Sequence, residues 1–142
     1  MEPGGKSRSL DGKHEVELSY TGEIPFGPPY FTLRIDSHSF GERIFGYGAL
    51  WSPDSSILVV TEWHTLERGS GPITSLLLIR PDDWTYSQFP KLTKGFAIAN
   101  YFVDRSRVLR HTDEIYQGGS FKVERQTDLD TIDDWKPLPL AR

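Results

Sequence analysis

The sequence predicts an all-β fold, an antiparallel meander of about nine to ten short strands. Short segments alternate apolar and polar residues, or are rich in β-branched and aliphatic residues, as strands are. Turn-forming Gly, Pro, Asp and Ser separate these segments at short intervals. Only the segment 127–135 has a helical pattern, with Thr127 as its expected cap, and it is long enough for one or two turns at most.

The chain of 142 residues is long enough for one hydrophobic core, so we expect one domain. Residues 1–13 contain three Gly, one Pro and a single large aliphatic residue, Leu10. Such a segment buries too little apolar surface to offset the entropy of ordering it. We therefore predict a disordered tail over 1–13 and a single β-rich domain over 14–142.

The first two predicted strands are half-buried. Residues 14–20 place Val16, Leu18 and Tyr20 on one face, and residues 30–36 repeat this alternation. Between them, the Gly and Pro residues of 21–29 interrupt any regular ladder, because Pro lacks the backbone donor. The two strands are expected to pair antiparallel.

The next two predicted strands, 56–63 and 73–80, are apolar on both faces and therefore belong in the middle of the core. The segment between them, 64–72, contains several Gly and a Pro and predicts an exposed, mobile loop. Further strands are predicted at the following three segments: 95–103, 107–112 and 120–126.

The sequence also contains an internal repeat. The tripeptide Asp-Asp-Trp at 82–84 recurs at 133–135, 51 positions later, and Trp51 and Phe102 are separated by the same offset. Each copy reads as a strand, an Asp-containing turn, a strand, a Gly-rich loop and a further strand. The repeat-like units lie near 14–46, 49–89 and 100–140, the first of them without its opening strand.

The segment Trp51–Thr61, WSPDSSILVVT, resembles the inner-strand pair of TolB-like and WD-repeat β-propeller blades, with a poorer echo at 102–111. Ser55 stands where that family usually has Gly. The resemblance implies a blade-like meander and a binding scaffold, with no catalytic residues to carry over. A propeller closes with about four to eight blades. Two or three chains would therefore have to complete one ring; otherwise the strands form a sandwich or barrel.

The composition argues against several classes of function. The formal net charge of −4 and the pI near 5.5 make nucleic acid an unexpected partner. The absence of cysteine excludes disulfides and thiolate chemistry. No apolar run approaches the about 18 to 20 residues that cross a bilayer, and no secretory signal is present, so we expect a cytoplasmic protein without membrane contact.

No cofactor or metal is expected, because the four His residues lack ligand spacing and the Gly residues form no phosphate-binding loop. Candidate binding residues are instead aromatic rings at strand ends or beside Pro, together with Glu62 and His64 at the mouth of the loop 64–72. The full set of candidates is Glu62, Trp63, His64, Phe26, Tyr30 and Trp84.

Three functions follow from these residues. The first is a non-enzymatic binding domain that presents 21–29 and 64–72 to a protein partner, as an inhibitor or immunity-type partner of a basic protein. The second is a carbohydrate-binding module assembled as an oligomeric propeller, with a saccharide stacked on Trp. The third is a hydrolase or isomerase that uses Glu62, His64 and His111. The sequence favours the non-enzymatic function and leaves open a monomer or a small homo-oligomer.

Overall fold

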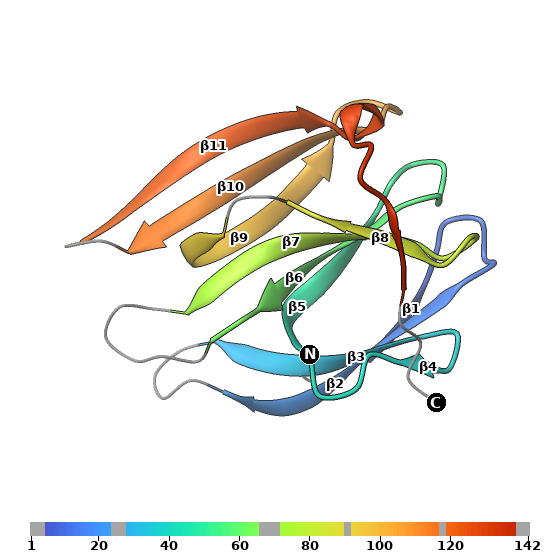
Figure 1. Cartoon of the computed structure of the whole chain (residues 1–142), viewed down its shortest axis with the longest axis horizontal. Helices are drawn as coiled ribbons and strands as arrows, with labels where there is room; N and C mark the ends of the chain where they lie inside the picture. The colour runs from blue at the N-terminus through green and yellow to red at the C-terminus, as the bar shows by residue number, and fades with distance from the viewer. Residues whose placement is uncertain (1–4, 24–27, 66–71, 90–91, 117–118, 139–142) are drawn as a thin grey trace.

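A computed structural model describes residues 5–23, 28–65, 72–89, 92–116 and 119–138. These residues form twelve strands and one 3₁₀ turn, η1 (Leu129–Thr131) (Figure 1). The strands are β1 (Gly5–Arg8), β2 (Glu15–Glu23), β3 (Pro29–Ile35), β4 (His38–Ser39), β5 (Ile44–Trp51), β6 (Leu58–Trp63), β7 (Ile73–Arg80), β8 (Thr85–Gln88), β9 (Thr93–Phe102), β10 (Val108–Tyr116), β11 (Ser120–Asp128) and β12 (Lys136–Pro137).

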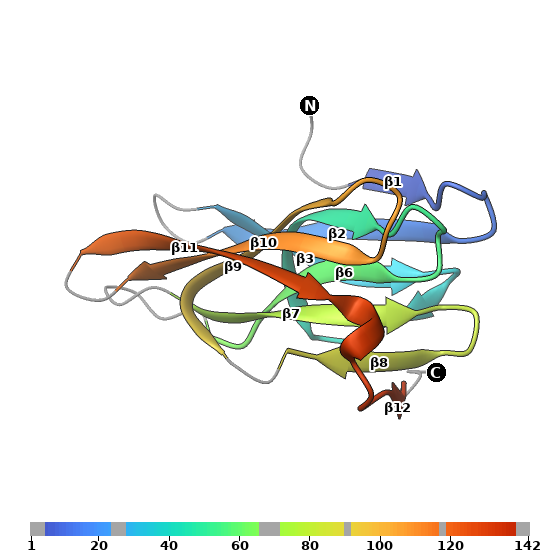
Figure 2. The same ribbon diagram turned by 90° about the horizontal axis from the view of Figure 1, so that it is seen from above.

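All twelve strands belong to one antiparallel sheet, whose main path runs β1-β2-β3-β5-β6-β7-β9-β10-β11. The predicted all-β meander is confirmed, and within the described residues the sheet does not close into a barrel. The strand β7 divides the sheet, because its residues Leu77–Arg80 pair with β8 whereas Ile73 and Thr74 pair with β9. As a result β9, β10 and β11 leave the path of β8 and form an upper layer (Figures 1 and 2).

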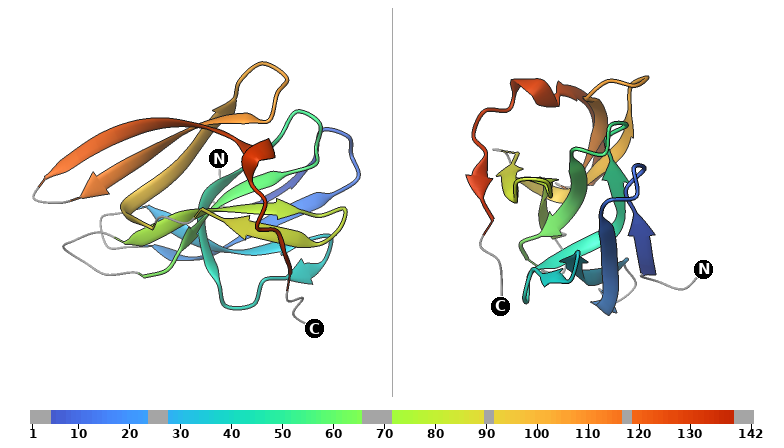
Figure 3. Two further views of the ribbon diagram at one scale, coloured as in Figure 1. Left: turned by 45° about the horizontal axis from the view of Figure 1, so that its top comes forward. Right: turned by 90° about the vertical axis from the view of Figure 1, so that its right-hand side faces the viewer.

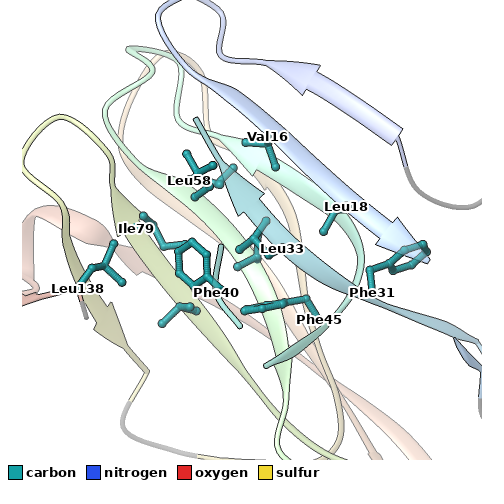
Figure 4. Close-up of a cluster of buried hydrophobic side chains, with 12 residues drawn as sticks. Val16, Leu18, Phe31, Leu33, Phe40, Phe45, Leu58, Ile79 and Leu138 are labelled. Carbon is teal, nitrogen blue, oxygen red and sulfur yellow. The ribbon is translucent and has the colours of Figure 1, made fainter. Parts of the chain in front are cut away.

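The central strands β6 and β7 are buried on both faces, as their sequences predict. Leu58, Val60, Leu77 and Ile79 point into a core shared with β2, β3 and β5, drawn in Figure 4. The alternate residues of the same strands point into a second core, shared with β9, β10 and η1. This second core joins the upper layer to the rest of the molecule.

The two later repeat units have the same order of elements. In one, a turn at 52–57 joins β5 to β6, and Asp82-Asp83-Trp84 precedes β8; in the other, a turn at 103–107 joins β9 to β10, and Asp133-Asp134-Trp135 precedes β12. Their turns meet, because Arg107 donates to Asp54 at 2.8 and 3.0 Å. The two Trp residues occupy different cores, Trp84 the first and Trp135 the second.

Two predictions require correction. The segment 1–13 is not a tail throughout: Gly5–Arg8 is an edge strand paired with Glu15–Leu18, since backbone ladder bonds do not need apolar side chains. Residues 1–4 lie outside the described residues. The predicted helix at 127–135 is only the three-residue turn η1, capped by Asp128 rather than by Thr127, and the chain is extended again at Ile132.

Candidate binding cleft

Two neighbouring residues at the end of β6, Glu62 and Trp63, belong to two different sites. Because successive residues of a strand point to opposite faces, Glu62 and Trp63 lie on different sides of the sheet. Trp63 lines a cleft between the lower strands and the upper layer. Glu62 belongs to a buried polar cluster. The sequence had placed the two side chains at one site.

The cleft has a volume of about 520 Å³ and is formed by β5, β6, β9 and β10, with Pro28 and Pro29 at the start of β3. Figure 3 shows β9 and β10 crossing above β5 and β6. Tyr47 and Ile98 lie on its rim, 52% and 36% exposed, so the cleft is open to solvent there. Its aromatic wall consists of Tyr47, Trp63, Phe96 and Tyr116.

Three of these rings are in contact in a continuous series. The centroids of Trp63 and Phe96 are 5.6 Å apart at an interplanar angle of 59°, and those of Phe96 and Tyr116 are 5.7 Å apart at 84°. Tyr30 extends the series behind Trp63, at 5.7 Å. Trp63 is only 4% exposed, so the aromatic surface open to the cleft belongs mainly to Tyr47, Phe96 and Tyr116.

The backbone of β5 makes room for Trp63. The pairing of β5 with β6 is irregular between Phe45 and Ala49, where β5 contains Gly46 and Gly48. A Cβ atom at Gly46 would lie 3.0 Å from the Trp63 Nε1 atom. Glycine at this position therefore allows the indole nitrogen to lie close to the β5 backbone.

Few polar side chains line the cleft. The hydroxyl of Thr61 donates to the Ala97 carbonyl at 2.6 Å, and the Tyr116 hydroxyl donates to Glu114 Oε1 at 2.9 Å. Burial and this hydrogen bond raise the pKa of Tyr116, which keeps the phenol protonated and donating. Glu114 is the one charged side chain among the described residues that line the cleft, and it is half-buried.

The polar cluster on the opposite face of β6 is satisfied internally. Arg43 donates to both carboxylate oxygens of Glu62, each at 2.7 Å, and Gln88 adds a third bond at 3.3 Å. The hydrogen bonds to Glu62 raise the pKa of Arg43 against the effect of burial, so the guanidinium stays charged. The His64 Nε2 atom lies 2.7 Å from the Ser75 hydroxyl. Because Arg43 donates to both Glu62 oxygens, neither oxygen is left without a hydrogen bond.

His111, the third residue of the hypothetical enzyme site, belongs to a different environment. Its Nε2 atom lies 2.8 Å from the Thr127 hydroxyl, and its ring packs on Phe89. No contact joins it to Glu62 or His64 within the described residues. Burial lowers its pKa, so the neutral ring is favoured.

The other candidate residues lie apart from the cleft wall. Tyr30 is half-buried behind Trp63, and Trp84 packs on the first core and against His38, 4.7 Å away between centroids. Phe26 lies outside the described residues, as do 24–27 and 66–71 of the two predicted loops.

Phe96, Glu114 and Tyr116 were not singled out from the sequence. A usable signal was present, because Phe96 and Ile98 alternate along one strand, as Glu114 and Tyr116 do along the next. Because Phe96 is opposite Glu114 in the pairing of β9 with β10, these side chains lie on one face of the sheet.

The described residues contain neither a metal-binding cluster nor a membrane-spanning helix. There, no three His, Asp or Glu side chains are grouped so as to hold a metal ion. Nor does that part of the chain contain a helix long and apolar enough to span a membrane.

Comparison with family models, with curated proteins and with solved structures finds no match. The resemblance of Trp51–Thr61 to propeller blades therefore stays a prediction.

Proposed function

We propose that this chain is a non-enzymatic binding domain that holds a segment of a protein partner in the cleft between β5, β6, β9 and β10. One observation carries the proposal: an open cleft of about 520 Å³ with an aromatic wall. Its size falls within the about 300 to 1,000 Å³ of ligand-binding sites, which are mostly apolar and contain few polar groups. Aromatic side chains are also the residues that most often anchor protein interfaces.

Binding is favoured over catalysis by the state of the ionisable groups. A general acid or base has to reach a substrate atom with a proton to give or accept. Glu62 is instead held by Arg43 on the face away from the cleft, and His64 is bonded to Ser75. These two groups support the fold and do not line the cleft.

A saccharide is the alternative ligand, because sugars stack on exposed aromatic rings. A sugar also carries a hydroxyl on almost every carbon, and each buried hydroxyl needs a hydrogen-bond partner. Thr61 already donates its hydroxyl proton to Ala97. The composition of the wall therefore favours apolar side chains of a protein segment.

The test is selection of a displayed random peptide library on the wild-type protein, with a glycan array in parallel. The selected peptides are then bound to Ile98→Lys, which places a charge on the cleft rim, and to Tyr101→Lys, a matched control. Tyr101 is on the same strand, 55% exposed and not part of the cleft lining. We expect Ile98→Lys to weaken binding about ten-fold, since an ammonium group opposes apolar contact, and Tyr101→Lys to change it less than about two-fold.

Peptides that bind Ile98→Lys as tightly as wild type would overturn the proposal. Binding of glycans without peptides would also overturn it and support the saccharide alternative. Circular dichroism of both variants provides the control that each is folded.

A further inference from the structure

We infer that the cleft selects a basic residue, with a lysine or arginine side chain of the partner segment seated between the aromatic wall and the Glu114 carboxylate. This inference rests on the proposed function and adds its specificity. Two features of the described residues carry it: the single carboxylate in an apolar cleft, and the ring faces beside it.

The carboxylate of Glu114 is available to a ligand. One of its oxygens accepts the Tyr116 hydroxyl at 2.9 Å, and within the described residues Glu114 has no other hydrogen bond and no ion pair. It thus differs from Glu62, whose oxygens are both held by Arg43. A half-buried carboxylate with a free oxygen attracts a cation and repels an anionic ligand, and the effect is stronger where water is partly excluded.

The aromatic wall favours the same charge. Aromatic faces attract cations through the ring quadrupole. Trp63 is only 4% exposed and lies deepest, so the accessible ring surface beside the carboxylate belongs mainly to the half-buried Phe96 and Tyr116. Trp63, Phe96 and Tyr116 form one series of tilted rings. The series ends at Tyr116, whose hydroxyl donates to Glu114, and Phe96 is opposite Glu114 in the strand pairing. A cation in the cleft can therefore contact ring faces and the carboxylate together, while its alkyl stem contacts Ile98 and Ala99.

A residue of a protein segment fits the cleft better than a small free cation. The volume of about 520 Å³ is several times that of one lysine side chain, and the surplus suits the apolar residues that flank it in a segment. The net charge of −4 favours a basic partner at longer range.

The chain also supplies a nearby cation, Lys122, which is opposite Glu114 in the pairing of β10 with β11. Lys122 is exposed, and no ion pair joins it to Glu114 among the described residues. Because it faces the same side, it competes weakly with a ligand cation. Replacement of Lys122 by Gln should therefore tighten binding of a basic ligand.

The experiment compares two defined probes, N-acetyl-lysine methylamide and its neutral isostere N-acetyl-norleucine methylamide. Each is titrated into the ¹⁵N-labelled full chain, and the Trp63 indole and Glu114 amide signals are followed. We expect the lysine probe to bind about five- to ten-fold more tightly than the norleucine probe in wild type. Glu114→Gln should reduce this ratio to about two-fold or less, whereas Glu124→Gln, the same change at an exposed position of β11, should retain it.

Equal or tighter binding of the norleucine probe at the cleft would overturn the inference and leave the proposed function standing. No shift with either probe would also overturn it. If, in addition, the selected peptides ignore Ile98→Lys, the proposed function falls with it. Tighter binding of free butyltrimethylammonium than of the lysine probe would overturn the assignment to a protein segment.

Discussion

The two faces of β6 at its C-terminal end differ in how their charged groups are used. On one face Glu62 is 6% exposed and is held at both oxygens by Arg43. On the other, the cleft beside Trp63 contains Glu114, half-buried, with one oxygen bonded to Tyr116. Glu62, although it stands beside Trp63 and His64 in the sequence, therefore forms a structural ion pair. The glutamate that lines the cleft, Glu114, comes from another strand, β10.

The largest effect should come from Arg43→Leu, which leaves Glu62 buried without its partner. Loss of one member of a buried ion pair costs about 3 to 5 kcal/mol. Because the Arg43 side chain is 34% exposed, water will replace part of the pairing, and we expect about 2 to 3 kcal/mol. Urea unfolding measures it, with Arg34→Leu, at the exposed position of β3, as the matched control at about 0.5 kcal/mol or less. Equal effects of the two variants would contradict the structural role of Glu62.

His14 is a second titratable group whose hydrogen bonds are satisfied within the fold. His14 lies between Asp36, 2.5 Å from Nδ1, and Asp82, 2.8 Å from Nε2. Burial lowers the pKa of His14, but the two hydrogen-bonded carboxylates outweigh it and the pKa is raised above the ordinary 6.5.

A raised folded-state pKa gives stability that is full below about pH 6.5 and is lost as the pH rises through the folded pKa. His111 acts in the opposite direction and at lower pH, since its lowered pKa gives stability that is full above about pH 6.5 and is lost as the pH falls through the folded pKa. The difference in unfolding free energy between wild type and His14→Gln isolates the first effect. We expect that difference to shrink from about pH 6 to about pH 9. A constant difference would contradict the stabilisation of protonated His14 by Asp36 and Asp82.

The smallest effect on stability should come from Glu114→Gln. The glutamine oxygen can still accept the Tyr116 hydroxyl, and no ion pair of Glu114 is lost among the described residues. We therefore expect a change within about 0.5 kcal/mol by urea unfolding, against a measurable loss of lysine-probe binding. A loss of stability equal to that of Glu62→Gln would show that the two glutamates have the same role.

Much of the sheet could be predicted because its central strands have an unambiguous pattern. The sequences of β6 and β7 are apolar on both faces, and both strands are buried on both faces in the structure. Only the end of β5 was predicted, as the opening strand of the repeat unit 49–89, because Gly46 and Gly48 interrupt the alternation in a strand whose pairing is itself irregular. β1 was missed because its pairing depends on backbone bonds, to which an exposed Gly-Lys-Ser-Arg sequence gives no clue.

The cleft could be predicted only in part. Trp63 was recognised as a candidate at the end of a core strand, but the wall is completed by β5, β9 and β10, which the order of residues does not place beside it. Likewise, the sequence shows Glu62 next to His64 but not that Arg43, 19 positions earlier, lies opposite it. The strand pairing and the division of the sheet at β7 determine which residues complete the cleft wall and which residue pairs with Glu62.

The most direct test of the cleft as the binding site is a ¹⁵N–¹H spectrum of the full chain titrated with the tightest selected peptide. We predict that the largest shifts occur at Gly46, the Trp63 indole, Ala97 and Glu114, which line the cleft. Gln88 and Ser75, bonded to each other at 2.8 Å in the polar cluster, should stay unchanged. Shifts centred on that cluster, with the cleft signals unmoved, would contradict the account.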